Sequence, residues 1–312
     1  MAHNLFLGMY SFQIKKPSTS NLAVIENNDF LSKAYPNHQI KFSEGFIQDI
    51  ISTIDKKAFK NEQNTLGAIL QEQSINNTQR TLDILINGGI TGIKQFLIDE
   101  LGGQTILSDK EIVGLKFYAR IWLPANTNTG YLFLQRYGSL TIKPIFDSIL
   151  KNVLKSHDYC LVGNRLIATT TKKRQKEFLK YSSIKNISIV SRRSSHETGA
   201  ADATSATIKL SNVNLKSNTE IRKEELDAAL KNHGFSIGER KYEIKATYEQ
   251  QINEDYKEER TVVLDGSEET INVIPNIVIP PDCIDIDNYP IFDKMQKLVD
   301  KEIDQIRLES KL

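Results

Sequence analysis

The chain has 312 residues and a formal net charge of +1, with 39% hydrophobic, 25% charged and 8% aromatic residues. This composition is typical of a soluble globular protein and excludes an intrinsically disordered chain. No apolar run approaches the roughly 18 residues that a membrane helix needs, and the first residues lack the pattern of a signal peptide. Two cysteines, Cys160 and Cys283, are too few for a disulfide scaffold or a metal cluster. We therefore expect a reduced cytoplasmic protein without direct membrane insertion.

The apolar pattern predicts strands and amphipathic helices that do not alternate regularly. In chain order, strands are expected at residues 5–14, 80–89, 112–123, 131–138, 160–169, around 187–189, and at 241–249, 260–264 and 270–274. Helices are expected at 43–54, 96–101, 145–154, 172–181, 219–233 and from about 290 to the end. Glycines set several boundaries: Gly88 and Gly89 stop the second strand, Gly102 closes the short helix, and Asp265-Gly266 turns the last hairpin.

Interspersed strands and helices predict the α+β class, with a mixed or mainly antiparallel sheet and packed amphipathic helices. The small polar residues 194–206 predict a flexible loop or linker. We therefore expect a main α+β domain at 1–193, which includes the basic segment. A C-terminal α+β subdomain at 207–312 would carry an acidic surface and a terminal helix.

Charge is distributed very unevenly along the chain. Residues 151–193 contain eleven Lys or Arg and two acidic residues, a net charge of +9. Residues 251–293 contain eleven acidic residues against Lys257 and Arg260, a net charge of −9. A surface that serves only solubility usually mixes both signs, so the basic segment is the strongest functional signal in the sequence.

The basic segment predicts a nucleic-acid-binding surface. In a helix, Lys172, Lys176 and Lys180 occupy positions i, i+4 and i+8 and form one cationic edge. Such a row of long cations neutralises phosphates and releases condensed counterions. The alternative is a helix face that is merely solvated. The candidate binding residues are Lys172, Lys173, Arg174, Lys176, Lys180, Lys185, Arg192 and Arg193.

The acidic segment has two interpretations. It can form a surface that docks on the basic segment, within the chain or on a partner, or it can consist of unconnected loops that keep the protein soluble. The first interpretation gives an alternative function: a protein-interaction subunit whose basic and acidic faces join it to a second protein or to another copy of itself.

A metal-dependent nuclease is a further alternative. Glu243 and Lys245 form an E-x-K motif in a predicted strand, which resembles the restriction-endonuclease-like nucleases. In that family two carboxylates hold Mg²⁺ and the lysine orients or activates the attacking water. One carboxylate is missing here, because the preceding hairpin offers only Glu239. We therefore expect no catalysis and no cofactor; Mg²⁺ would be required only under this alternative.

The sequence also predicts the positions of three single residues. Alternation places Asp83 on the polar face of an apolar strand, where we assign it no role. His157 is expected at a helix C-terminus, where the helix dipole stabilises its positive charge. Trp122 is expected in the core.

The segment 112–154 contains a strand pair that ends in LFLQRYG and a long amphipathic helix after it. This layout is similar to that of the soluble DNA-binding subunit of the Kiwa defence system and its uncharacterised relatives in bacterial phage-defence and mobile-element islands. The resemblance implies a cytoplasmic, non-catalytic, DNA-associated role, beside a second defence-system protein. It transfers no catalytic residue. We therefore expect a nucleic-acid-binding component of a bacterial anti-phage defence system, with DNA as its ligand.

Overall fold

The computed structural model describes residues 5–17, 23–55, 57–192, 205–211, 228, 230–232, 234, 242–253, 256–264 and 273–311. The chain forms two compact units: unit 1 comprises Met1–Thr169 and Ile277–Leu312, and unit 2 comprises Thr170–Asn276. The predicted division into 1–193 and 207–312 does not coincide with these units. The basic helix belongs to unit 2, and the terminal helix belongs to unit 1 with the N-terminal residues.

Unit 1 is built on a nine-stranded antiparallel sheet, which places the protein in the predicted α+β class. The strand order is β10-β1-β8-β7-β4-β3-β2, and β9 and β15 also pair with β1. The strands are β1 (Leu5–Lys15), β2 (Phe59–Lys60), β3 (Leu66–Asn76), β4 (Thr81–Ile90), β7 (Val113–Trp122), β8 (Thr129–Tyr137), β9 (Cys160–Leu161), β10 (Ile167–Ala168) and β15 (Ile277–Val278). The predicted strands at 5–14, 112–123 and 131–138 are confirmed.

One face of this sheet is covered by three helices and a π-helical turn. The helices are α1 (Asn27–Ala34), α2 (Gln48–Ile54) and α3 (Lys143–Lys155), and the π-helical turn at Lys41–Ile47 precedes α2. Every third or fourth residue of α3 is apolar, so one stripe of the helix, including Phe146 and Ile149, is fully buried. These side chains pack with Ile84 and Ile121 of the sheet in one hydrophobic core.

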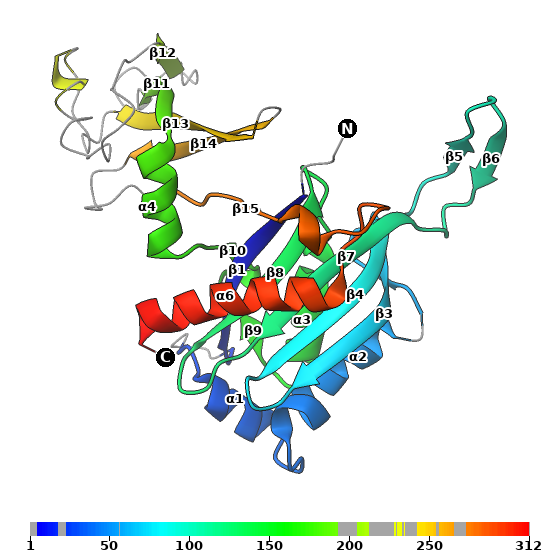
Figure 1. Cartoon of the computed structure of the whole chain (residues 1–312). Helices are drawn as coiled ribbons and strands as arrows, with labels where there is room; N and C mark the ends of the chain where they lie inside the picture. Colours follow the sequence, from blue (N-terminus) through cyan, green and yellow to red (C-terminus); the bar gives the residue numbers. More distant parts are fainter. Residues whose placement is uncertain are drawn as a thin grey trace, which may run out of the picture. The chain divides into compact units, whose positions relative to one another are not determined.

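The opposite face is covered by α6 (Phe292–Ser310), which crosses the sheet in Figure 1. Val299 and Ile303 of α6 pack with Trp122 and Phe133 of the sheet in a second core. Trp122 is 1% exposed, as its expected core position requires. In the described part of the chain, no helix combines the length and apolarity needed to cross a membrane.

A cluster of charged and polar side chains lies under α6. Arg120 Nε donates to Asp83 Oδ1 at 2.5 Å, and both residues are 3% exposed. The Tyr118 hydroxyl also donates to Asp83, and the guanidinium of Arg120 binds Asp300 of α6. Alternation does place Asp83 on the face away from the first core. That face is covered by α6, however, and Asp83 therefore has a structural role that the sequence did not indicate.

The predicted helix at 96–101 is wrong. Residues Gln95–Ile98 form β5 and Gln104–Leu107 form β6, a separate two-stranded sheet. The Asp99 carboxylate causes the turn between them, because it accepts hydrogen bonds from the backbone N–H groups of Leu101 and Gly103. A side-chain oxygen that binds these N–H groups stabilises a turn in place of the helical ladder.

Glycines also act differently from the prediction in two other strands. β4 continues through Gly88 and Gly89, because β4 and β7 approach closely there: a Cβ on Gly89 would lie 2.3 Å from the Cα of Gly114. The expected strand at 160–169 is instead divided into β9 and β10. Gly163 and Asn164 have φ values of 65° and 56° between them, and this left-handed turn interrupts the strand.

Unit 2 contains a four-stranded antiparallel sheet and the basic helix. The strand order is β12-β11-β13-β14, with β11 (Ser183–Arg192), β12 (Ser205–Ser211), β13 (Tyr242–Asn253) and β14 (Tyr256–Leu264). The basic helix is α4 (Lys172–Tyr181). β14 pairs with β13, and residues 205–206 of the predicted linker belong to β12. Most of the predicted strand at 270–274 lies outside the described residues. Most of the predicted helix at 219–233, the rest of the linker and the Asp265-Gly266 turn lie outside the described residues.

Candidate nucleic-acid interface

The basic helix α4 forms because its sequence supplies a cap and an apolar anchor. The Thr171 hydroxyl accepts a hydrogen bond from the backbone N–H of Arg174 at 3.3 Å, which satisfies one N–H group of the first turn. Phe178 is 3% exposed and packs with Ile187 of β11 and Ile244 of β13 in the core of unit 2. The anchored side of α4 therefore faces the sheet, and its charged side faces solvent.

The lysines of α4 share one exposed edge, as the helical spacing predicted. Lys172, Lys176 and Lys180 are all exposed. Among the described residues, Lys176 and Lys180 form no ion pair. The Nζ atom of Lys180 lies 5.3 Å from the ring centroid of Tyr181, whose side chain is 65% exposed. The edge thus ends in an aromatic ring next to a cation, an arrangement that suits stacking on a base.

The first turn of α4 contains no acidic residue and begins with Lys172, Lys173 and Arg174. The helix dipole places partial positive charge at this end, so three cations there oppose it. Helix N-termini also present backbone N–H groups that bind anions. A phosphate at this end of α4 would therefore be stabilised by the dipole and by the side chains together.

Lys185 does not belong to this edge. Its Nζ atom binds Glu259 and lies 3.6 Å from Glu249 Oε2. Tyr248 packs in the core with Phe178 of α4, so Glu249, the next residue of β13, points to the opposite face of the sheet. The hydrogen bond to Glu259 raises the pKa of Lys185. The structure therefore separates Lys185 from α4 and pairs it with acidic residues.

Two further predicted binding residues lie at or beyond the end of β11. Arg192 is the last residue of that strand. The side chain of Arg192 and the whole of Arg193 lie outside the described residues, so the predicted basic surface is described only at α4 and at Lys185.

The E-x-K residues lie side by side on β13. Lys245 Nζ is 2.5 Å from Glu243 Oε1, so the two side chains form an ion pair. Among the residues that the structure describes, those registered opposite them on neighbouring strands are Val190, Ser188 and Val263, none of which is a carboxylate. In the described ranges, no group of three His, Cys, Asp or Glu side chains could hold a metal ion.

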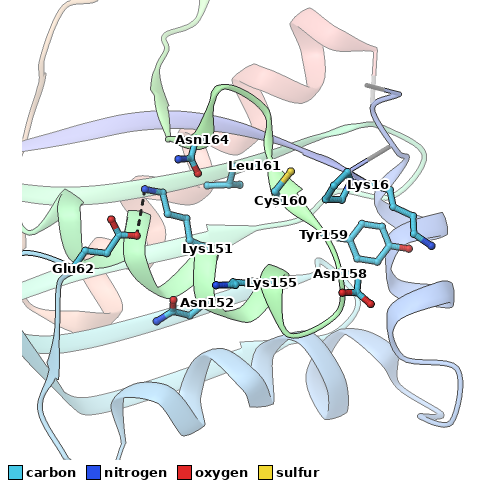
Figure 2. Close-up of a pocket in the computed structure, with 11 residues that line it drawn as sticks. Lys16, Glu62, Lys151, Asn152, Lys155, Asp158, Tyr159, Cys160, Leu161 and Asn164 are labelled. Atoms are coloured by element: carbon cyan, nitrogen blue, oxygen red, sulfur yellow. Dashed lines mark ion pairs between the residues drawn. The ribbon is translucent and has the colours of Figure 1, made fainter. Parts of the chain in front are cut away.

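Unit 1 contains a cavity of about 620 Å³, and part of the basic segment lines it (Figure 2). Lys151 and Lys155 lie one turn apart on α3, and Lys16 follows β1. Lys151 Nζ lies 3.6 Å from Glu62 Oε1, the ion pair drawn in Figure 2. Both lysines belong to the basic segment 151–193, and their i, i+4 spacing places them on one side of a helix. The basic run 151–193 is therefore divided between two separately packed units.

His157, expected at a helix C-terminus, follows α3 and binds a second helix. Its Nε2 atom lies 2.9 Å from Asp49 Oδ2, and its ring lies 4.4 Å from the ring of Tyr35. The same Asp49 oxygen accepts a hydrogen bond from the Tyr35 hydroxyl at 2.9 Å. The Asp49 carboxylate, together with the dipole of α3, thus holds His157 in place.

Comparisons with known proteins give no match for this chain. No protein-family model matches the chain, and neither a curated protein nor a solved structure does so.

Proposed function

We propose that this protein binds DNA through the cationic edge of α4, as a non-catalytic cytoplasmic component of a bacterial anti-phage defence system. The observation that carries the proposal is the exposure of Lys172, Lys176 and Lys180 along one edge of a helix that Phe178 anchors. The choice of DNA and of defence rests on the resemblance of residues 112–154 described above.

The composition of α4 supports this proposal over a merely solvated helix. Residues Lys172–Tyr181 contain five Lys or Arg and one acidic residue, Glu177. Cations in the first turn cost about 0.3–1 kcal/mol each at low ionic strength, because they oppose the helix dipole. A helix that needed only solubility would gain stability from acidic residues there. An anionic ligand at this end of α4 would interact favourably with both the dipole and these cations.

The mode of recognition follows from the side chains involved. Lysines bind phosphate as point charges, so they fix the position of the protein on DNA without reading base edges. The exposed ring of Tyr181 adds a surface on which an unpaired base can stack. We therefore expect binding that depends weakly on base sequence and strongly on salt.

The experiment compares two triple variants with equal changes in charge. Lys172, Lys176 and Lys180 of α4 are replaced by Glu in the first, and Lys294, Lys297 and Lys301 of α6, which are also exposed, in the second. Fluorescence anisotropy of labelled duplex and single-stranded DNA measures both affinities. The α4 variant should lose binding while the α6 variant keeps most of it. Equal losses would show that net charge, not α4, determines binding, and would overturn the proposal.

A further inference from the structure

The β5–β6 hairpin exposes a cluster of large apolar side chains to solvent. The chain leaves the nine-stranded sheet after β4 and returns to it at β7, and the hairpin extends between them (Figure 1). Its large apolar side chains are exposed: Phe96 57%, Leu97 51%, Ile98 66%, Leu101 98% and Ile106 65%. Clustered exposure of this kind marks an interaction surface, whereas single exposed apolar residues do not.

The hairpin is also incomplete as a sheet. β5 and β6 have four residues each and pair only with one another among the described strands. An isolated two-stranded sheet is marginally stable in water, and its outer edges present unpaired N–H and C=O groups. A further strand at one edge would satisfy those groups.

The sequence of β5 is complementary to itself. Two β5 strands can pair antiparallel around a two-fold axis that is perpendicular to the sheet. Residues paired across this axis must have their side chains on the same side of the sheet. With Leu97 on the axis, Phe96 faces Ile98 of the second strand, and Lys94, just before β5, lies beside the turn that follows the second β5 strand and contains Glu100. With Phe96 on the axis instead, Lys94 would face Ile98. Only the first register places apolar residues opposite apolar residues and a cation beside an anion.

The charges on either side of β5 are available for this pairing. Lys94 and Glu100 are exposed, and within the described part of the chain neither forms an ion pair. Asp99, between β5 and Glu100, is already engaged with backbone N–H groups of its own turn. We propose that β5 pairs antiparallel with β5 of a second copy of this chain, in the register centred on Leu97, to form a four-stranded sheet.

Two other arrangements fit less well. Pairing through β6 would centre on residues Gln104–Leu107, which offer fewer apolar side chains and no flanking pair of opposite charges. Insertion into lipid would carry Asp99 and Glu100 at the tip of the hairpin, and the unpaired strand edges, into a medium without hydrogen-bonding partners. Four-residue strands bury little area, so the dimer is expected to be weak and concentration-dependent.

Charge reversal tests the register, and the chain supplies its own control. Sedimentation of the full chain over a concentration series to about 200 µM should show a reversible dimer. Lys94→Glu and Glu100→Lys should each weaken it about tenfold, because each turns two symmetric attractions into repulsions. The double variant Lys94→Glu/Glu100→Lys restores both pairs and should dimerise like the unaltered chain, as should an equimolar mixture of the two single variants.

Cysteine cross-linking tests the same register by distance. Leu97→Cys places two thiols opposite each other at the axis, within the reach of a disulfide. Thr105→Cys is the matched control, because Thr105 faces Leu97 on β6 and its two copies would lie three strand spacings apart, about 14 Å. Both are made with Cys160→Ser, since Cys160 is partly exposed. Dimer formation on mild oxidation is expected for Leu97→Cys alone.

The outcomes separate this proposal from DNA binding, on which it does not depend. A chain that stays monomeric throughout the concentration series, or a Thr105→Cys variant that cross-links as fast as Leu97→Cys, would overturn it. Single charge reversals without effect on dimerisation would exclude the proposed register. A monomeric chain that still loses DNA binding in the α4 variant would refute only the dimer.

Discussion

Arg120 and the lysines of α4 carry the same charge in opposite environments. Arg120 is 3% exposed and is bound by Asp83 and Asp300, so its charge is neutralised within the fold. Lys176 and Lys180 are exposed and lie on a helix with a single acidic residue. A buried charge has to be paired to be tolerated, whereas an exposed row of like charges lowers helix stability unless a ligand binds it. The first charge therefore has a structural role, and the second is available to the ligand that we propose.

The largest expected effect follows from removing the buried cation. Arg120→Ala leaves the Asp83 carboxylate buried beside the Tyr118 hydroxyl without its positive partner. Such an uncompensated charge destabilises a protein by about 3–5 kcal/mol. Urea unfolding followed by circular dichroism measures the loss. Asp300→Asn is the control; because the Asp300 side chain is 47% exposed, it should cost much less. A similar loss in both variants would contradict a buried role for Arg120.

Removing the anchor of α4 should have the next largest effect, and it should be confined to unit 2. Phe178→Ala removes a ring that is 3% exposed, which costs about 3 kcal/mol. Tyr181→Ala on the same helix removes an exposed ring and should change stability by less than about 0.5 kcal/mol. Hydrogen exchange of amides in β11 and β13 reports the difference. Equal protection in the two variants would show that Phe178 does not hold α4 on the sheet.

Tyr118 gives the buried cluster a pH dependence. Burial first, and then the Asp83 charge, raises the pKa of Tyr118 well above its usual value of 10.0. Above about pH 10 the tyrosine loses its proton in the unfolded chain but keeps it in the folded chain. The stability present at neutral pH is therefore lost as pH rises toward the raised pKa. Tyr118→Phe should lower the free energy of unfolding by about 1 kcal/mol at pH 7, because a hydrogen bond is lost. Above about pH 10, the free energy of unfolding of this variant should fall less steeply than that of the unaltered protein. Parallel declines in urea titrations from pH 8 to 11 would argue against this role.

The smallest expected effect concerns catalysis. Glu243→Gln breaks the ion pair with Lys245 and should leave the fold intact, because both side chains are partly exposed. Purified protein with Mg²⁺ should not degrade labelled DNA, with or without this substitution. Robust cleavage that the variant abolishes would restore the nuclease interpretation.

Periodicity predicted the parts of the fold that depend on local pattern. The strand pair β7–β8, the helix α3 and the basic helix α4 all contain their apolar residues at the spacing of the element that they form. The hairpin at β5 and β6 was predicted as a helix because Phe96, Leu97 and Leu101 also fit a helical stripe. The turn that decides the matter depends on the side chain of Asp99, which periodicity does not evaluate.

Long-range partners could not be predicted in the same way. Asp83 and Arg120 are 37 residues apart, and Lys185 and Glu259 are 74 residues apart. Each pair depends on strand order and on which face a helix covers, and a single sequence does not specify either. The ion pairs of Lys185 could not be predicted for this reason, because Glu249 and Glu259 follow it in the chain by more than 60 residues.

The salt dependence of DNA binding by the α4 triple variant tests the central claim most directly. Each lost phosphate contact on duplex DNA should lower the slope of log K against log salt concentration by about 0.9, so three lost contacts should lower it by roughly 2.7. The α6 triple variant should keep the slope of the unaltered protein, and the loss should be the same for unrelated DNA sequences. An α4 variant whose slope equals that of the unaltered protein would contradict the account, because its lysines would then contact no phosphate.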